Sequence, residues 1–516
     1  MTYPLIYVKL QGIESDLQPH EINPALYSGG QNISYDNNGM QKCRGYIQTY
    51  GALNNTPLYC LYTDTIDSEW LYAGVNNISV TSNGSHIDIT PDGGITITEA
   101  ERWTGGILNG VIVLSSQDIE PIYWDGVLSN KMVTLPGWDP NDRAAVIRPF
   151  KNFLVALNVT KVDGNYKNMV KWSDIADSGG IPPTWDHTLP GNLAGENLLG
   201  GQEGPLIDAL PLGDLLVIYK NNSCYTMQLT GGQFVFAFKD LFRNIGALSK
   251  DCIAAFRGQH CVLTPDDVVV HDGRAVQSIV DMRMRKWIFD SINEPYAHTS
   301  YVVNNHPRDE IWICFPTKDA QNPNMALVWN YNDNLFSVRD LPDSPFINIG
   351  IVRGDDIDDP PDILNPFWDQ DNEIWDIDQT PWNKQYLDST SKNLVMCMGN
   401  NLMLQDAGDT FNNVEFESYV ERLSFPTQDL KHVHLVRALR PIIYGDEGTV
   451  LKIQVGGQLH ANDPIYWTPE RDFIVGQDRF DVFVKGRFLS FKIRSESSGK
   501  WQIKEIGIEI APFERY

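Results

Sequence analysis

Two histidines, and separately a run of acids, are the residues whose types and spacing could hold a metal ion. His432 and His434 stand two positions apart, which places both side chains on the same face if the segment is a strand. A zinc site needs further ligands, and no third Cys or His lies close by in the sequence. Two histidines on a half-exposed strand face are therefore the simpler interpretation.

A cluster of carboxylates in one proline-containing segment offers the hard oxygen ligands that calcium prefers. Its members are Asp355, Asp356, Asp358, Asp359, Asp369, Asp371 and Glu373. The segment lacks the glycine and the distal glutamate of an EF-hand loop. A solvated acidic loop is the favoured interpretation.

Carbohydrate chemistry would need two carboxylates in one cleft and aromatic side chains that stack on sugars. With 66 acidic residues in the chain, the sequence singles out no pair. Tryptophans that could stack on sugars are Trp172, Trp185, Trp368, Trp375 and Trp382. In a β-rich protein such tryptophans are more often part of the core.

No H-E-x-x-H, P-loop or G-x-S-x-G motif is present. The sequence therefore predicts a non-enzymatic protein, with no catalytic, cofactor-binding or metal-binding residues and no cofactor.

The elements that would position any site are short strands. Apolar runs lead into aromatic or acidic turns over 111–126, 261–273 and 310–332, where Asp-Gly and Asn-Asp suit tight hairpins. Such units spaced tens of residues apart are typical of propeller blades. The segments expected to form six or seven irregular blades are 57–90, 101–135, 146–186, 206–240, 246–282, 297–342 and 374–410. The best helical candidate is Phe238 to Ser249.

The predicted fold class is all-β, with three parts. Residues 1–50, rich in Gly, Asn and Pro, are expected to form an extended arm, and 51–412 an irregular propeller. Acids and a proline pair near 354–385 predict an exposed insertion. From 413 to 516 regular alternation of apolar residues predicts a compact β-sandwich.

Charge and cysteine content limit the possible partners. The formal charge of −26 opposes a surface that binds nucleic-acid phosphates. An odd number of cysteines without a C-x-x-C pair indicates buried free thiols in a reducing cytoplasm. The seven are Cys43, Cys60, Cys224, Cys252, Cys261, Cys314 and Cys397. Neither a signal peptide nor a long apolar run is visible, so we expect no membrane insertion.

Four separated segments resemble a known family. Asn32 to Tyr46 contains Cys43-Arg44-Gly45-Tyr46, and Lys171 to Asp177 contains Trp172-Ser173-Asp174 followed by Trp185. Leu327 to Pro342 looks like a blade-closing strand and turn, and Gly486 to Ile503 like a terminal strand pair. In their order and spacing, these segments resemble the tail hub or nozzle proteins of short-tailed bacteriophages.

The resemblance implies an architecture rather than a reaction. Members of that family join a propeller to β-sandwich elements and form a ring, usually of six copies, that extends the portal channel and conducts DNA. The implied partners are the portal or adaptor ring and tail fibre or spike proteins. The implied location is the virion, after synthesis in the host cytoplasm. DNA would pass through the channel without specific binding.

Two other functions remain open on the residues alone. One is a carbohydrate-active tail depolymerase built on a propeller. The other is a cellular interaction propeller of the WD-repeat type, whose regular period is absent and whose Trp-Asp signature occurs only at Trp124-Asp125. Within the leading interpretation, Arg487 and Trp501 are expected to have structural roles in the sandwich. The insertion near 354–385 is expected to pack on a neighbouring subunit or line the channel, or else to fold back on its own blade.

Overall fold

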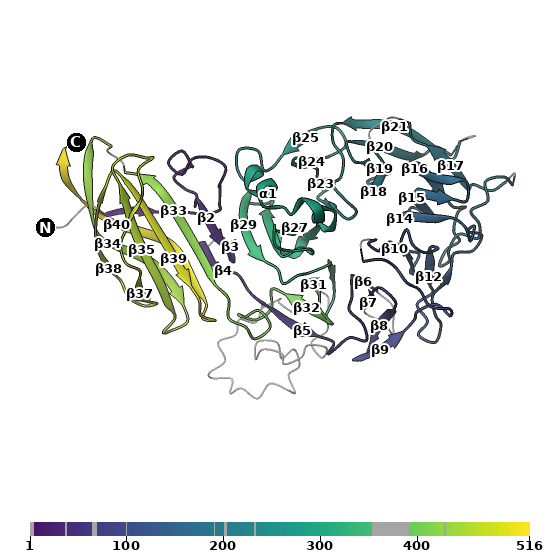
Figure 1. The fold of residues 1–516 in the computed structure, drawn as a ribbon, viewed down its shortest axis with the longest axis horizontal. Coiled ribbons are helices and arrows are strands. Elements are labelled where there is room, and N and C mark those ends of the chain that lie inside the picture. Colours follow the sequence, from purple (N-terminus) through teal and green to yellow (C-terminus); the bar gives the residue numbers. More distant parts are fainter. Residues whose placement is uncertain are drawn as a thin grey trace.

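The computed structural model describes residues 5–36, 39–63, 70–99, 101–189, 191–200, 204–231, 234–352, 392–427 and 430–515. Strands dominate this part of the chain, and they form a propeller beside a β-sandwich (Figure 1). The acidic insertion predicted near 354–385, with Trp368, Trp375, Trp382 and the carboxylates from Asp355 to Glu373, lies outside the described residues.

Seven four-stranded antiparallel sheets within the described residues form the blades. The first three are β6 (Tyr59–Tyr62), β7 (Trp70–Ala73), β8 (Ile78–Ser82) and β9 (Ser85–Asp88); β10 (Thr104–Leu108), β11 (Val111–Ser115), β12 (Ile122–Trp124) and β13 (Val133–Thr134); and β14 (Arg143–Phe150), β15 (Phe153–Lys161), β16 (Gly164–Trp172) and β17 (Gly195–Leu198). The next three are β18 (Leu206–Leu212), β19 (Leu215–Lys220), β20 (Ser223–Leu229) and β21 (Phe236–Arg243); β22 (Ile253–Phe256), β23 (Gln259–Leu263), β24 (Val268–His271) and β25 (Val276–Ser278); and β26 (Tyr301–Asn305), β27 (Glu310–Phe315), β28 (Met325–Asn330) and β29 (Leu335–Asp340).

The seventh blade closes the ring with a strand from the other end of the chain. It consists of β30 (Ile347–Gly350), β31 (Asn393–Met398), β32 (Asn401–Gln405) and β5 (Tyr46–Thr49). β5 pairs antiparallel with β32, so a segment near the N-terminus completes a blade built from residues some 300 positions later. The expected all-β propeller with a sandwich is confirmed, and the blade count is seven in the described residues.

Two six-stranded sheets form the sandwich. One contains β1 (Leu5–Val8), β3 (Ile33–Asp36), β4 (Gly39–Lys42), β34 (His432–Gly445), β38 (Phe480–Gly486) and β40 (Trp501–Arg515). The other contains β2 (Gly29–Gln31), β33 (Ser418–Pro426), β35 (Val450–Gln458), β36 (Tyr466–Trp467), β37 (Arg471–Ile474) and β39 (Phe488–Ser495). The segment expected to be an extended arm, 1–50, thus supplies strands to both sandwich sheets and to the seventh blade.

The helical candidate Phe238 to Ser249 is wrong. Its first half belongs to β21, which pairs with β20 in the register Phe238↔Met227. Pairing with a neighbouring strand overrides a weak local preference for helix. The described α-helix is α1 (Arg285–Ser291), and short 3-10 turns occur at η1 (Glu294–Thr299) and η2 (His306–Arg308). No helix in the described ranges is both long and apolar enough to cross a membrane.

Two arginines connect blades around the inner ring of the propeller. The first strands of most neighbouring blades, from β10 round to β6, lie side by side and form its inner ring. Arg102, which precedes the second blade, reaches across to the sixth and donates to the carbonyl oxygens of Thr299 and Ser300 at 3.0 Å. Arg148 binds Asp208 at 2.8 Å and Asp251 at 2.7 Å, so it joins the third, fourth and fifth blades. These contacts therefore cross-link blades on the inner side of the ring.

Candidate functional site at the junction of propeller and sandwich

The N-terminal segment runs between the two domains and binds both. The backbone N–H of Ile13 donates to the carbonyl of Phe336 at 3.1 Å, and that of Asn32 donates to Val338 at 2.8 Å. One apolar core continues from the sandwich interior through Ile33 to Phe336 and Val338 in β29. The sandwich and the sixth blade are consequently packed as one body.

Asn32 is the central polar contact of this junction. Its side-chain N–H groups donate to the Asp340 carboxylate at 2.8 Å and to the carbonyl of Glu417 at 2.7 Å. Its side-chain oxygen accepts the backbone N–H of Asp340 at 2.9 Å. The residue is buried and has a φ of +57°, a left-handed conformation that Asn tolerates better than most residues.

An arginine cluster lies next to this contact. Asp406, after β32, binds Arg339 at 2.7 Å and Arg308 at 3.3 Å. Arg339 also donates to the carbonyl oxygen of Arg44 at 2.6 Å and stacks on Trp312. Burial alone would raise the pKa of Asp406, but Arg308 and Arg339 outweigh it and hold that pKa below its usual value. Asp406 is thus a buried carboxylate that ties the sixth and seventh blades to the N-terminal segment.

Glycine is required at position 45, beside Arg44, because another part of the backbone lies very close to it. Its N–H donates to the carbonyl of Gly408 at 3.0 Å, and a Cβ at this position would overlap the backbone of Thr410. The Arg-Gly-Tyr sequence therefore has a geometric reason: the glycine lets the chain pass against 408–410 on its way into β5.

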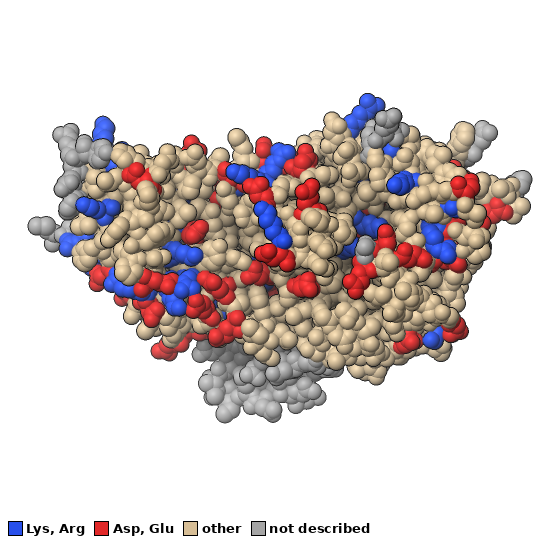
Figure 2. Space-filling model, in the orientation of Figure 1, with Lys and Arg blue, Asp and Glu red and all other residues tan. Residues whose placement is uncertain are grey.

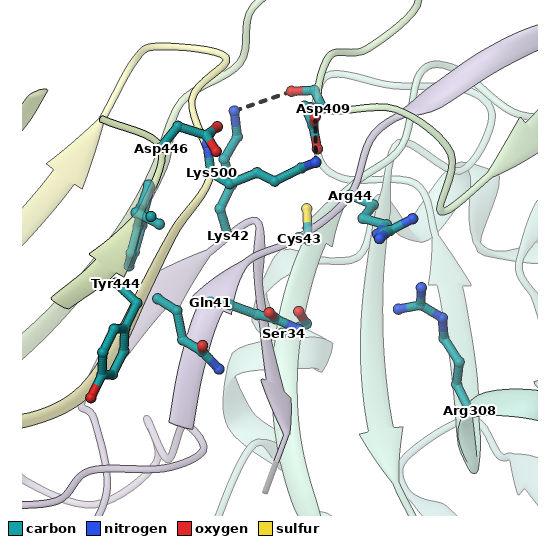
Figure 3. Close-up of a pocket in the computed structure, with 13 residues that line it drawn as sticks. Ser34, Gln41, Lys42, Cys43, Arg44, Arg308, Asp409, Tyr444, Asp446 and Lys500 are labelled. Carbon is teal, nitrogen blue, oxygen red and sulfur yellow. Dashed lines mark hydrogen bonds and ion pairs between the residues drawn. The ribbon is translucent and has the colours of Figure 1, made fainter. Parts of the chain in front are cut away.

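A cleft of about 350 Å³ opens between the two domains at this point (Figure 3). Its walls come from β3, β4, β34 and β40 of the sandwich and from Arg308 and Asp409 on the propeller side. Lys500 forms an ion pair with Asp409 at 3.2 Å. Trp501 forms part of the wall and is nevertheless 2% exposed. The lining combines cations, carboxylates, amides and hydroxyl groups, which suits a polar ligand.

Lys42 is the most deeply placed cation of this cleft. Its Nζ donates to the carbonyl oxygens of Ser497 at 2.7 Å and Asp409 at 3.2 Å, and it lies 4.2 Å from the centre of the Phe416 ring. Burial lowers the pKa of Lys42, although nearby acids oppose the effect.

The histidine pair considered as a metal site lies in β34, where the pairing with β40 is irregular between Val433 and His434. His434 is buried and His432 is partly buried. Within the ranges that the structure describes, no group of three or more His, Cys, Asp or Glu is arranged to hold a metal ion.

The tryptophans considered for sugar stacking are core where they can be seen. Trp185 is 2% exposed and packs edge-on against Trp138, with 4.8 Å between ring centres. Trp172 is buried, and its indole N–H donates to the carbonyl of Leu193 at 2.8 Å. Neither side chain is available to a polysaccharide.

All seven cysteines are buried free thiols, as expected. Burial raises the pKa of Cys252 and of Cys261 to about 12 and raises that of Cys43, which lines the cleft. Since the thiolate is the nucleophile, these positions are poorly suited to thiol chemistry.

The two sandwich residues singled out from the sequence occupy structural positions. Trp501 is core, and its indole N–H donates to the Ser418 hydroxyl at 3.3 Å. Arg487 is the single residue between β38 and β39, which belong to different sheets. Its backbone N–H donates to the carbonyl of Gln458 at 2.8 Å, and its carbonyl accepts from Thr427 at 3.0 Å.

Sequence reasoning missed a buried His–Tyr–His chain between the fourth and fifth blades. The Tyr219 hydroxyl lies 2.8 Å from Nδ1 of His260 and 2.6 Å from Nε2 of His271. His260 Nε2 donates to the carbonyl of Pro211, and the backbone N–H of Gly273 donates to His271 Nδ1. Every ring nitrogen of His260 and His271 has a suitable hydrogen-bond partner only when both imidazoles are neutral.

This chain predicts a pH dependence of stability. Burial and the neighbouring His260 lower the pKa of His271 to about 4, from an ordinary value near 6.5. The folded state favours the neutral form of His271. The contribution of this preference to the free energy of unfolding is therefore complete above pH 6.5 and is lost as the pH falls toward 4. The loss amounts to roughly 3 kcal/mol.

The measurement is urea unfolding of the wild type and of His271→Gln at several pH values. The stability advantage of the wild type should shrink by that amount between pH 7 and pH 4. His298→Gln, at an exposed position, is the matched control. If the stability difference between wild type and His271→Gln stayed constant between pH 7 and pH 4, His271 would not be held neutral by the fold.

Comparisons with known proteins identify no family. No family model matches the sequence, and no curated protein matches it. A solved structure with a detectable likeness is a crystal structure of BBS1N in complex with ARL6DN, soaked with mercury. It shares 8% sequence identity with this chain and has a TM-score of 0.28. The match covers 56% of this chain and 78% of that chain. At this TM-score the likeness carries no argument, so the propeller assignment rests on the strand pairing.

Proposed function

We propose that this chain is a structural component of a short phage tail, a hub or nozzle protein that forms a ring, most simply of six copies. The ring extends the portal channel, retains the genome and conducts DNA during ejection. Its neighbours are the portal or adaptor ring and the tail fibre or spike proteins, and its location is the virion.

The observation that carries the proposal is the junction between propeller and sandwich. Of the four segments that resemble tail hub proteins, two meet there directly, because Asn32 binds Asp340 and Arg339 binds the backbone of Arg44. A third supplies Trp501 to the same cleft. Segments that are far apart in the sequence thus serve one purpose, holding two all-β domains in a fixed relation. Such rigidity suits a ring subunit that bears load.

The arginine contacts inside the propeller bear on the path of DNA. Arg102 and Arg148 bridge opposite and adjacent blades with hydrogen bonds and ion pairs. A duplex therefore cannot pass through the propeller of one subunit while these contacts hold. In the proposed assembly the conduit lies between copies, with the propeller as part of its wall.

Charge supports a conduit rather than a DNA-binding protein. The chain carries a formal charge of −26, and a six-membered ring would carry about six times that value. Figure 2 shows acidic and basic side chains interspersed over both domains on one face, without a broad basic area. Phosphate-binding basic rings would retain DNA through counterion release, whereas an acidic wall leaves it mobile.

The isolated protein should accordingly bind double-stranded DNA negligibly at physiological salt. Its net charge opposes association, and the steep salt dependence of a phosphate-binding surface should be absent. A mobility-shift or filter-binding titration at several salt concentrations measures this. Submicromolar affinity that falls steeply with salt would contradict the prediction.

The proposal itself is tested by immunolabelling of virus particles. An antibody to this chain should decorate the short tail in negatively stained images of particles from a host in which the gene is expressed. Labelling of the capsid alone, or of no particle, would overturn the proposal. Incubation of the protein with host polysaccharide gives an independent control, because the proposed role predicts no depolymerisation.

A further inference from the structure

We propose that Asn83 is a site of spontaneous deamidation in the folded protein, where its side-chain amide is converted to aspartate or isoaspartate. The reaction needs no enzyme and no reactant other than water. This modification site goes beyond the structural role proposed above and does not depend on it.

The first argument is the turn in which Asn83 lies. Asn83 and Gly84 form the two-residue loop between β8 and β9, because Ser82 pairs with Ser85. Their φ values of +46° and +71° are typical of a type I′ hairpin, for which Asn-Gly is a preferred sequence. Both residues are exposed, and a Cβ added to Gly84 would meet no atom within 4 Å. The glycine that follows Asn83 is therefore open to reaction.

The chemistry joins two groups that this turn places next to each other. The backbone nitrogen of Gly84 attacks the side-chain carbonyl carbon of Asn83, and glycine hinders this attack least because it has no Cβ. A nitrogen–carbon bond forms, and the side-chain nitrogen takes up the displaced proton and leaves as ammonia. Water then opens the resulting succinimide at one of its two carbonyl groups, which gives aspartate or isoaspartate. The net reaction consumes one water and releases one ammonia.

A second Asn-Gly turn shows what restrains this reaction. Asn109 and Gly110 form the equivalent loop between β10 and β11, with φ values of +53° and +87°. The Asn109 side-chain amide donates to the carbonyl oxygens of Asp177 at 3.1 Å and Gly180 at 3.2 Å. These two bonds fix an amide group that must rotate and lose its nitrogen during deamidation.

The side chain of Asn83 lacks this restraint. Within the described part of the chain no hydrogen bond holds it, and the residue is exposed. The turns at Asn83 and Asn109 thus share a backbone conformation and a glycine, and they differ in what holds the amide. We therefore expect the fold to protect Asn109 and to leave Asn83 reactive.

The position of Asn83 gives the modification a structural consequence. β9 is the outer strand of the first blade, and Nε2 of His86 in β9 lies 2.8 Å from the carbonyl oxygen of Tyr50, just after β5. Asn54 donates to the carbonyl of His86 at 3.2 Å. Isoaspartate adds a carbon atom to the backbone of the loop, and loop length sets the register of a hairpin. The modification therefore disturbs β9 where it contacts the segment that closes the ring.

The test is ageing of the purified full-length protein at mildly alkaline pH, followed by digestion and mass spectrometry of the peptides that contain Asn83 and Asn109. In the folded protein Asn83 should be converted about tenfold faster or more, because two hydrogen bonds of Asn109 must break before it can react. In urea the two rates should be similar, because both sites have the sequence Asn-Gly.

A variant assigns the isoaspartate to this position. Asn83→Gln should remove most of the label that protein isoaspartyl methyltransferase adds to the aged protein, because the longer glutamine side chain does not form a succinimide. Circular dichroism and a melting curve show that the variant is folded. The proposal would be overturned by a rate at Asn83 that does not exceed the rate at Asn109 in the folded protein, by an equally large difference in urea, or by labelling that Asn83→Gln leaves unchanged.

Discussion

Replacing Trp501 with alanine should lower the free energy of unfolding by about 3–5 kcal/mol, the range for deletion of a large buried aromatic side chain. Trp501 is 2% exposed and belongs to the core shared by the sandwich and the sixth blade. The variant also leaves the Ser418 hydroxyl without its indole donor. Chemical denaturation of the purified variant measures the loss; under the proposed tail role, particles carrying the variant should lack a complete tail.

A matched control for Trp501 lies in the same domain. Tyr466, in β36, is 79% exposed, so Tyr466→Ala should change stability by less than about 0.5 kcal/mol. If Trp501→Ala melted like wild type and assembled normally, the sandwich would not depend on this core.

Asn32→Ala should have an effect of similar size, about 3–5 kcal/mol, because it removes three side-chain hydrogen bonds, one of them to a carboxylate. It also forces alanine into a left-handed conformation at φ +57°. The bonds connect the N-terminal segment to Asp340 in the sixth blade and to Glu417 near the sandwich. Urea unfolding should show reduced stability and weaker coupling of the two domains.

Two further variants separate backbone strain from lost contacts at Asn32. Glycine adopts the left-handed conformation without strain but also lacks the three hydrogen bonds. Asn32→Gly should therefore be more stable than Asn32→Ala by the strain alone, about 1 kcal/mol. Asn244→Ala places alanine at another exposed left-handed position, with φ +63°, and measures the strain alone. If Asn32→Ala and Asn244→Ala were equally stable relative to wild type, the hydrogen bonds to Asp340 and Glu417 would contribute nothing.

The blades could be anticipated from the sequence because their strands are local. Each of the first six blades is a run of antiparallel neighbours, so apolar runs and tight turns mark it directly. Local patterns could not predict two features of the fold. One is the pairing of β5 with β32, and the other is the addition of β1 to β4 to the sandwich sheets. They join segments hundreds of residues apart, and the local pattern of a strand does not name its partner.

The junction cleft was hidden from sequence reasoning for the same reason. Arg44 and Gly45 stood in a recognised segment, as did Arg339 and Asp340, but nothing in either segment indicated that they meet. The sequence did indicate that the seven cysteines are buried and that Trp172, Trp185 and Trp501 favour the core. Those inferences depend on side-chain chemistry alone, whereas the cleft depends on topology.

The proposed ring depends on the copy number of this chain in an isolated tail, which native mass spectrometry measures and electron microscopy locates. We expect several copies per particle, six in the simplest case, arranged in one ring around the channel with the arginine contacts inside each propeller in place. A single copy per particle, or a duplex running through the centre of a propeller, would contradict it.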